Sequence, residues 1–315
     1  MEKILILGGT GIMGAPLTEK CINAGYAVDV VSLDAPESHH PNLRYIQTKD
    51  ARNAEFLTGL LQNHYDVVVD FMTYSSVHFR RIAPLFLNAC GRYFYLSSCR
   101  VFADEQVPIT ESAPRLIDVT DDQELLVSDD YCMHKARGED FLRACGKNNW
   151  TIVRPSTTYG HYSAQLLSLS LPLMLKAKEA GKTILLHEKA QNISASLTSG
   201  DDVAEMLLRL LFLPQAQGND YNVTSSESHT WSEIAAYYRE IFGITTEWVD
   251  EDTYLRFRNP DYDPVAHKWM KWQMHYARLF RRVYDNSKLL AATGLRQQDF
   301  LPLYDGLLDI RNHIL

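Results

Sequence analysis

The sequence predicts an α/β protein built on a doubly wound parallel sheet. A short apolar run at residues 4–7 leads directly into a glycine-rich turn and then a helical pattern. Apolar runs continue to alternate with helical patterns along the first half of the chain. Runs of this kind are typical of parallel strands that are covered by helices on both faces.

The first unit carries a dinucleotide-binding pattern. The segment "KILILGGTGIMG" contains Gly9-x-Gly11-x-x-Gly14, and Gly8 adds a wider-spaced variant. Such a turn lets the backbone approach a pyrophosphate, and the helix expected over residues 11–24 would direct its N-terminal N–H groups at the phosphates. We therefore expect a dinucleotide to contact Gly8, Thr10, Gly11, Ile12, Met13 and Gly14.

The second strand, residues 27–31, indicates which dinucleotide binds. It is followed by Ser32 and Asp34, with no Arg or Lys before Arg44. A free ribose 2′-OH needs an acceptor, whereas a 2′-phosphate needs a cation. This favours NAD over NADP, with Asp34 or Ser32 as the acceptor.

Further strands are predicted at residues 43–47, 66–71, 92–98 and 150–155, with a helix over 76–91. Ligands bind such sheets at the carboxyl ends of the strands. Functional residues are therefore expected where these strands end.

Three segments have the spacing Tyr-x-x-x-Lys, at residues 45–49, 131–135 and 284–288. The first pair lies along a strand, about 13 Å apart at ~3.3 Å per residue. The third comes late in the chain, after the strands of the sheet. Only Tyr131 and Lys135 begin a good helical pattern, where positions i and i+4 share a face about 6 Å apart.

The pair at 131–135 also follows the strand whose end carries Ser97 and Ser98. A phenol with an ordinary pKa near 10 needs a nearby cation to act as a base at neutral pH. We expect Lys135 to supply that charge and to hold the nicotinamide ribose, while Ser98 holds the substrate oxygen. Ser98, Tyr131 and Lys135 are the catalytic candidates.

Composition excludes other classes. A formal charge of −8 argues against nucleic acid as a partner. No apolar run is long enough to span a membrane, and the N-terminal one is too short for a signal peptide. Five scattered cysteines without a C-x-x-C pair fit a cytoplasmic protein, and no metal site is expected.

At these motifs the chain resembles the extended short-chain dehydrogenase/reductase superfamily, in particular its NAD-dependent sugar-nucleotide epimerase/dehydratase family. "YLSSCRVF" resembles the strand end that carries the catalytic Ser, and "YCMHK" the Tyr-Lys pair. "KDARN" resembles the adenine-contacting segment, and "VRPSTTYG" the segment that lines the nicotinamide. "SGDDVAEMLLRLL", "NDYNVTSSESHTWSEIA" and "YDNSKLLAATGL" match later landmarks of the family.

The resemblance implies a Rossmann NAD-binding domain over residues 1–155 with a return segment at about 191–225. A smaller substrate lobe is implied over 156–190 and 226–315, and a homodimer through the helices after the fourth and fifth strands. It adds Asp50, Phe71 and Pro155 to the cofactor contacts, and Cys99 and Thr158 to the substrate side.

Two departures from the family pattern matter. Dehydratases of the family carry an Asp-Glu pair after the catalytic residue, but this chain has Cys99 and Arg100, which disfavours 4,6-dehydration.

The second departure is at Ala195, which stands near the position where the family has a phosphate-binding Arg. Residues 254–284 carry seven Lys or Arg against two acidic residues. This segment either compensates for the lost contact or forms an amphipathic helix with solvated charges. Its candidate substrate contacts are Arg278, Arg281 and Arg282.

The leading hypothesis is an NAD-dependent 4-epimerase of a nucleotide sugar that works through a 4-keto intermediate. The alternative is an NAD(P)H-dependent 4-ketoreductase. A hypothesis of another class is a dinucleotide-sensing or RNA-associated binding protein. His161 and His187 lie near the expected pocket, where surface or packing roles are favoured over substrate binding.

Overall fold

The computed structural model describes residues 1–160 and 163–314, so His161 lies outside the described residues. Its core is a seven-stranded parallel sheet in the order β13-β6-β5-β4-β1-β2-β3. The strands are β1 (Lys3–Leu7), β2 (Ala27–Ser32), β3 (Leu43–Gln47), β4 (Tyr65–Asp70), β5 (Cys90–Leu96), β6 (Trp150–Pro155) and β13 (Asn219–Val223). The predicted Rossmann fold is confirmed.

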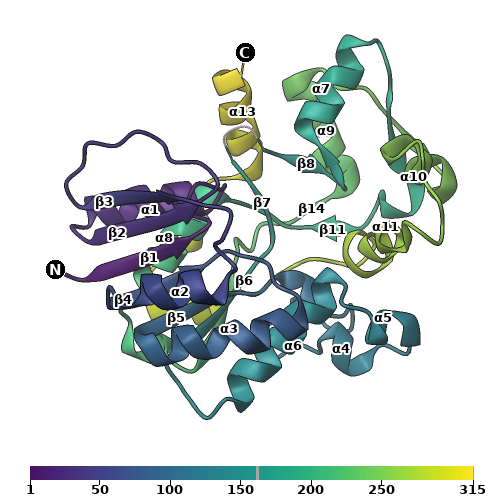
Figure 1. Cartoon of the computed structure of the whole chain (residues 1–315). Helices are drawn as coiled ribbons and strands as arrows, with labels where there is room; N and C mark the ends of the chain where they lie inside the picture. The colour runs from purple at the N-terminus through teal and green to yellow at the C-terminus, as the bar shows by residue number, and fades with distance from the viewer. Residues whose placement is uncertain (161–162, 315) are drawn as a thin grey trace.

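Alternate residues of each strand face opposite layers of helices. Ile4 and Ile6 of β1 pack with α1 (Gly14–Asn23), α8 (Gly200–Leu210) and α12 (Ser287–Thr293). Leu5 and Leu7 pack with α2 (Ala54–Leu61), α3 (Ser76–Ala89) and α6 (Tyr131–Ala144). The second layer lies in front of the sheet in Figure 1. Helix α12 packs on the sheet although its residues fall within the predicted lobe.

A second hydrophobic core holds together the remaining elements, which gather at the upper right of Figure 1. Its helices are α7 (Leu171–Glu179), α9 (Trp231–Phe242), α10 (Glu251–Arg258), α11 (Lys268–Gln273) and α13 (Leu303–Ile314). Its paired strands are β10 (Ile184–His187) with β15 (Thr246–Val249), β11 (Ser194–Ala195) with β14 (His229–Thr230), and β8 (Gln165–Leu166) with β9 (Leu169–Ser170). His187 is buried here, beside Tyr254.

Element ends differ slightly from the prediction. Helix α1 begins at Gly14 rather than at residue 11, because the preceding residues form the glycine turn. Strand β5 ends at Leu96, so Ser97 and Ser98 lie just beyond its carboxyl end. The link from β5 to α6 contains η1 (Cys99–Val101), α4 (Leu116–Val119) and α5 (Gln123–Val127).

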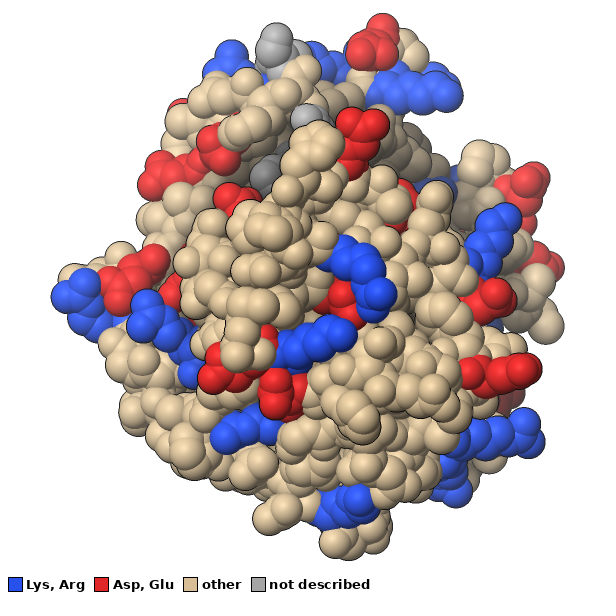
Figure 2. Space-filling view, turned by 60° about the vertical axis from the view of Figure 1, so that its left-hand side comes forward, with Lys and Arg blue, Asp and Glu red and all other residues tan. Residues whose placement is uncertain are grey.

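The surface carries no single-sign field on the face shown in Figure 2, where basic and acidic side chains are interspersed. Within residues 1–160 and 163–314, no helix has the length and apolar character needed to cross a bilayer. Over the same residues, no group of three or more His, Cys, Asp or Glu is arranged to hold a metal ion.

Candidate active site

The glycine turn between β1 and α1 is shaped for close backbone approach. Gly8 has a φ of +80°, and its N–H donates to the Val31 carbonyl at 2.8 Å. A Cβ on Gly14 would lie 2.5 Å from the Gly8 carbonyl oxygen, so the helix starts directly against the turn. This arrangement fits a dinucleotide pyrophosphate, which needs bare backbone at a helix N-terminus.

Beyond the turn, a hollow of about 370 Å³ contains both predicted ribose acceptors. The Thr10 hydroxyl donates to the Asp34 carboxylate at 2.6 Å, and the Ser32 hydroxyl does so at 2.9 Å. These two hydrogen bonds lower the pKa of Asp34. Asp34 therefore presents a carboxylate to this hollow, which suits a ribose 2′-OH and repels a 2′-phosphate.

The other predicted cofactor contacts lie at different distances from the glycine turn and from the ribose hollow. Phe71 packs against the turn, where an added Cβ on Gly8 would lie 3.3 Å from its own Cβ. Met13 is the N-cap residue of α1. Asp50 lies in a separate hollow against α2, while Lys49 and Arg52 line the ribose hollow. Lys49 belongs to the first Tyr-Lys segment, which sequence spacing alone had set aside.

The three catalytic candidates are brought together at the carboxyl end of β5. Ser98 and Tyr131 line a cavity of about 350 Å³ that also includes Ile12 of the glycine turn and Pro155. The Ser98 hydroxyl oxygen accepts a hydrogen bond from the Arg100 backbone N–H at 3.2 Å. Lys135 is 1% exposed, and its ammonium lies 5.8 Å from the centroid of the Tyr131 ring. The phenol thus faces a cavity that the glycine turn reaches.

The pKa of the Tyr131 phenol depends on its burial and on its nearest polar and charged neighbours. Burial raises the pKa of Tyr131, and the opposing influences are the Ser98 hydrogen bond and the positive charge of Arg100. The Lys135 ammonium instead donates to the Leu96 carbonyl at 2.6 Å and the Met72 carbonyl at 3.4 Å. That Lys135 makes this phenol acidic therefore stays a prediction.

A buried carboxylate balances the positive charge of Lys135. It was not predicted from the sequence. Asp70 ends β4 and accepts hydrogen bonds from Tyr93 at 2.7 Å and Tyr74 at 3.1 Å. Burial raises the pKa of Asp70 to about 6, and Lys135 opposes that rise. Burial also lowers the pKa of Lys135 to about 8, while Asp70 opposes that fall. An acid at the end of the predicted strand 66–71 was the available signal.

The predicted substrate residues separate into two groups. Cys99, Thr158, Arg278 and Arg282 line the cavity, as does Ala195. Arg281 does not: it is exposed and pairs with Asp104 at 2.9 Å.

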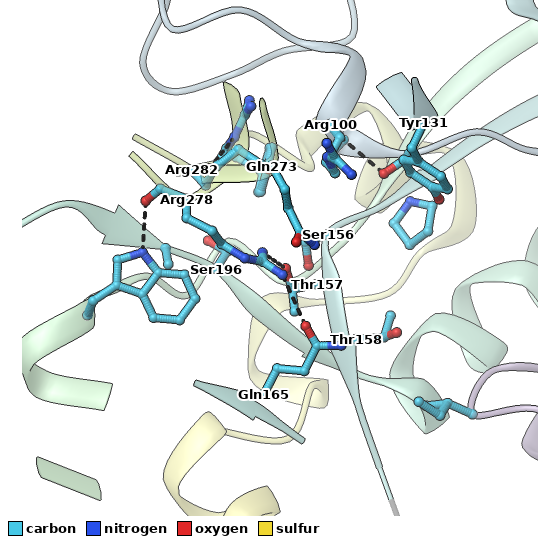
Figure 3. Close-up of a pocket in the computed structure, with 18 residues that line it drawn as sticks. Arg100, Tyr131, Ser156, Thr157, Thr158, Gln165, Ser196, Gln273, Arg278 and Arg282 are labelled. Carbon is cyan, nitrogen blue, oxygen red and sulfur yellow. Dashed lines mark hydrogen bonds between the residues drawn. The ribbon is translucent and has the colours of Figure 1, made fainter. Parts of the chain in front are cut away.

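The two lining arginines of the C-terminal segment differ in what they contact. The Arg282 guanidinium donates to the backbone carbonyls of Phe102 at 3.0 Å and Tyr276 at 2.9 Å. Arg278 donates to the Thr157 hydroxyl at 2.7 Å and the Gln165 side chain at 3.0 Å, as the dashed lines in Figure 3 show. Burial lowers the pKa of Arg278 to about 10. Arg278 thus keeps its charge beside neutral oxygens, which fits an anion in the cavity.

Several further lining residues were not predicted to bind substrate, among them Arg100, Gln273 and Tyr284. Arg100 lies beside Tyr131 (Figure 3), with its guanidinium carbon 5.2 Å from the ring centroid. Gln273 comes from the end of α11, and Tyr284 belongs to the third Tyr-Lys segment. Lys288 of that segment pairs with Asp220 at 3.0 Å, away from the cavity. Arg100 had a sequence signal, since it directly follows the Ser-Cys strand end.

The fold and the glycine turn define the class of protein, which is an NAD-dependent enzyme built on a Rossmann fold. Residues 4–224 match the family model "NAD dependent epimerase/dehydratase family". The match extends over more than half of the chain. The chain belongs to this family.

Solved structures share the whole architecture. A dTDP-glucose 4,6-dehydratase from Bacillus anthracis, in complex with NAD, has 16% identity and a TM-score of 0.72, with 99% of this chain and 96% of that chain covered. A UDP-glucuronic acid 4-epimerase from Bacillus cereus, in complex with UDP-glucuronic acid and NAD, has 16% identity and a TM-score of 0.71, with 99% and 98% covered. Pal from Bacillus thuringiensis has 13% identity and a TM-score of 0.73, with 99% and 98% covered. At these identities the likeness establishes the fold. No curated protein sequence matches the chain significantly.

Proposed function

We propose that the chain catalyses 4-epimerisation of a nucleotide sugar through a 4-keto intermediate, with Ser98, Tyr131 and Lys135 as its catalytic residues. The observation that carries the proposal is the common cavity of Ser98 and Tyr131, which the glycine turn reaches through Ile12. NAD, when bound, supplies hydride transfer to and from the sugar carbon. The glycine turn, Ser32 and Asp34 are the residues proposed to hold it.

The side chains divide the proton chemistry between them. Ser98 holds the sugar oxygen, and ionised Tyr131 removes the hydroxyl proton as the C–H bond gives up its hydride. Return of the hydride to the opposite face of the carbonyl carbon, and of the proton to its oxygen, would invert that carbon with no net change in atoms or electrons. Lys135 orients the ribose and stabilises the ionised phenol once the site is filled.

The cavity wall favours a nucleotide sugar and disfavours dehydration. Arg100, Arg278 and Arg282 line it, and no Asp or Glu does so among the residues that the structure describes. Elimination of water needs an acid and a base beside the sugar, but the Arg100 side chain offers only hydrogen-bond donors, and burial raises the pKa of the Cys99 thiol to about 12. We propose Arg278 as the diphosphate contact.

The test is product analysis with purified protein and a panel of UDP- and dTDP-hexoses, in the presence of NAD. We expect the 4-epimer to appear without net consumption of NAD. Tyr131→Phe should reduce the rate by about 10²–10⁴-fold, because the proton acceptor is lost. Tyr304→Phe is the matched control, since this Tyr lies on α13 and contacts Glu240.

The outcomes distinguish the alternatives. Turnover that consumes NADH or NADPH stoichiometrically would identify a 4-ketoreductase. Full activity of Tyr131→Phe would contradict the assigned centre. Retained NAD without turnover of any nucleotide sugar would favour a binding protein.

We further propose the domain division 1–155 with 191–225, and 156–190 with 226–315, and a cytoplasmic homodimer formed through α3 and α6. Val77 on α3 is 64% exposed, which suits an intersubunit contact. Light scattering should give twice the mass of one chain, and Val77→Glu should shift the protein towards monomer. A monomeric wild-type protein would contradict the dimer.

A further inference from the structure

A guanidinium with spare hydrogen-bonding capacity lies next to the proposed base. Arg100 follows Ser98 by two residues, and η1 holds its side chain against the Tyr131 ring at 5.2 Å. One terminal nitrogen contacts Asp130 at 3.4 Å. Its Nε is buried and has no hydrogen-bond partner among the described residues. A buried N–H donor on a cation costs free energy unless an acceptor forms a hydrogen bond with it.

A second arginine, Arg258, belongs to a different element from Arg100. Arg258 ends α10, and its guanidinium carbon lies 5.2 Å from the Trp269 ring centroid. Its Nη1 is also buried without a partner among residues 1–160 and 163–314. Burial lowers the pKa of Arg258, and repulsion from Arg100 lowers it further. Arg258 is not among the residues that line the cavity, so it would support an anion bound at Arg100 through its positive charge.

The position of this pair identifies the part of the substrate it would meet. Tyr131 must contact the reacting hydroxyl, so a group within reach of Arg100 belongs to the same sugar ring. Arg278 is the proposed diphosphate contact and is held towards Thr157 and Gln165. In Figure 3, Arg100 lies with Tyr131 at one end, while Arg278 extends towards Thr157 and Gln165 at the other.

We propose that Arg100, supported by Arg258, binds an acidic substituent of the sugar, so that the substrate is a nucleotide-linked acidic sugar such as a hexuronic acid. The C6 carboxylate of a hexuronic acid is attached to C5, the neighbour of the oxidised C4. Planar guanidinium donors match a carboxylate in a bidentate manner. This assignment rests on the proposed function.

The experiment compares UDP-glucuronic acid with UDP-glucose, and the corresponding dTDP sugars, which differ only in the group at C6. Dissociation constants are measured on NAD-loaded protein for the wild type, Arg100→Gln, Arg100→Lys and Arg281→Gln. Arg281 provides the matched control because it is exposed and outside the cavity.

We expect the wild type to bind the acidic sugar at least tenfold more tightly than the neutral one. Arg100→Gln should weaken binding of the acidic sugar by about 10- to 100-fold, as expected for the loss of charge-assisted hydrogen bonds. It should weaken binding of the neutral sugar by less than about threefold. Arg100→Lys should recover part of the loss, and Arg281→Gln should leave both constants unchanged.

Each other result overturns the inference. If Arg100→Gln lowers the affinity for both sugars equally, Arg100 contacts the diphosphate or only supports the structure of the site. A wild type without preference for the acid would remove the inference while the proposed function stands. Failure of every sugar nucleotide to bind would remove both. If Arg100→Gln does not retain NAD, the wild-type preference and Arg100→Lys decide the matter.

Discussion

Replacing Gly14 by alanine tests the packing of the glycine turn against α1. The added Cβ would lie 2.5 Å from the Gly8 carbonyl oxygen and 2.6 Å from the Gly9 Cα. Both are backbone atoms, so no side chain can rotate away. The turn and the helix must therefore move apart.

The size of the effect follows from these distances. Carbon atoms in contact lie about 3.5–4.0 Å apart, so the turn must open by about 1 Å. Overpacking of this kind lowers the free energy of unfolding by about 1–3 kcal/mol. A displacement of about 1 Å in a preorganised site can cost about 100-fold in function. We expect NAD affinity to fall at least tenfold, which corresponds to about 1.4 kcal/mol.

Gly59→Ala is the matched control. Gly59 lies within α2, and an added Cβ there would meet no atom within 4 Å. Alanine should raise the free energy of unfolding by about 0.5–1 kcal/mol, because glycine is unfavourable inside a helix. Urea unfolding and NAD titration measure both variants. Wild-type stability and NAD affinity in Gly14→Ala would refute the packing described here.

Three further substitutions test the electrostatics. Asp34→Asn removes a carboxylate that repels a 2′-phosphate, so the ratio of NAD to NADP affinity should fall about tenfold, or about 1.4 kcal/mol; an unchanged ratio would contradict its place at the ribose. Asp70→Asn removes a charge that supports the Lys135 ammonium, whose pKa is about 8, so the alkaline limb of the kcat/KM profile should move to lower pH. A limb that stays in place would show that Lys135 does not set it. Glu139→Gln breaks a buried pair with Arg154 at 2.7 and 2.8 Å and should lower the free energy of unfolding by about 3–5 kcal/mol at pH 7. Burial alone would raise the pKa of Glu139, but Arg154 holds it below its ordinary value. The pair's contribution is therefore present above the ordinary carboxyl pKa and is lost as pH falls through the lowered one, so an equal deficit at pH 7 and pH 3 would count against it.

The sheet was predictable because its signals are local. Apolar runs and glycines marked β1 and α1 within two or three residues, and β3 matched the predicted residues 43–47. The seventh strand, β13, is short and polar at its start, and it joins β6 only through long-range pairing. Its contribution to the sheet depends on tertiary contacts that periodicity does not encode.

The candidate site was predictable where one element carries it. Helical spacing placed Tyr131 and Lys135 on adjacent turns, and the strand end placed Ser98 beside them. Arg281 was wrongly grouped with Arg278 and Arg282, because composition shows that a segment is basic but not which side chains face the cavity. Tyr284 lines the cavity through its pairing with Ile109, a contact that no local pattern reveals.

The charge around Tyr131 depends on residues that are far apart in sequence. Spacing correctly placed an ammonium one turn away, but Lys135 donates to the Leu96 carbonyl and is compensated by Asp70 from another strand. Burial raises the pKa of the phenol, and the positive charge of Arg100 opposes that rise. If Arg100 binds an acidic sugar, that charge is neutralised as substrate enters, and Lys135 becomes the remaining cation near the phenol. The acid recognised by Arg100 would thus leave Lys135 as the cation that stabilises the ionised phenol.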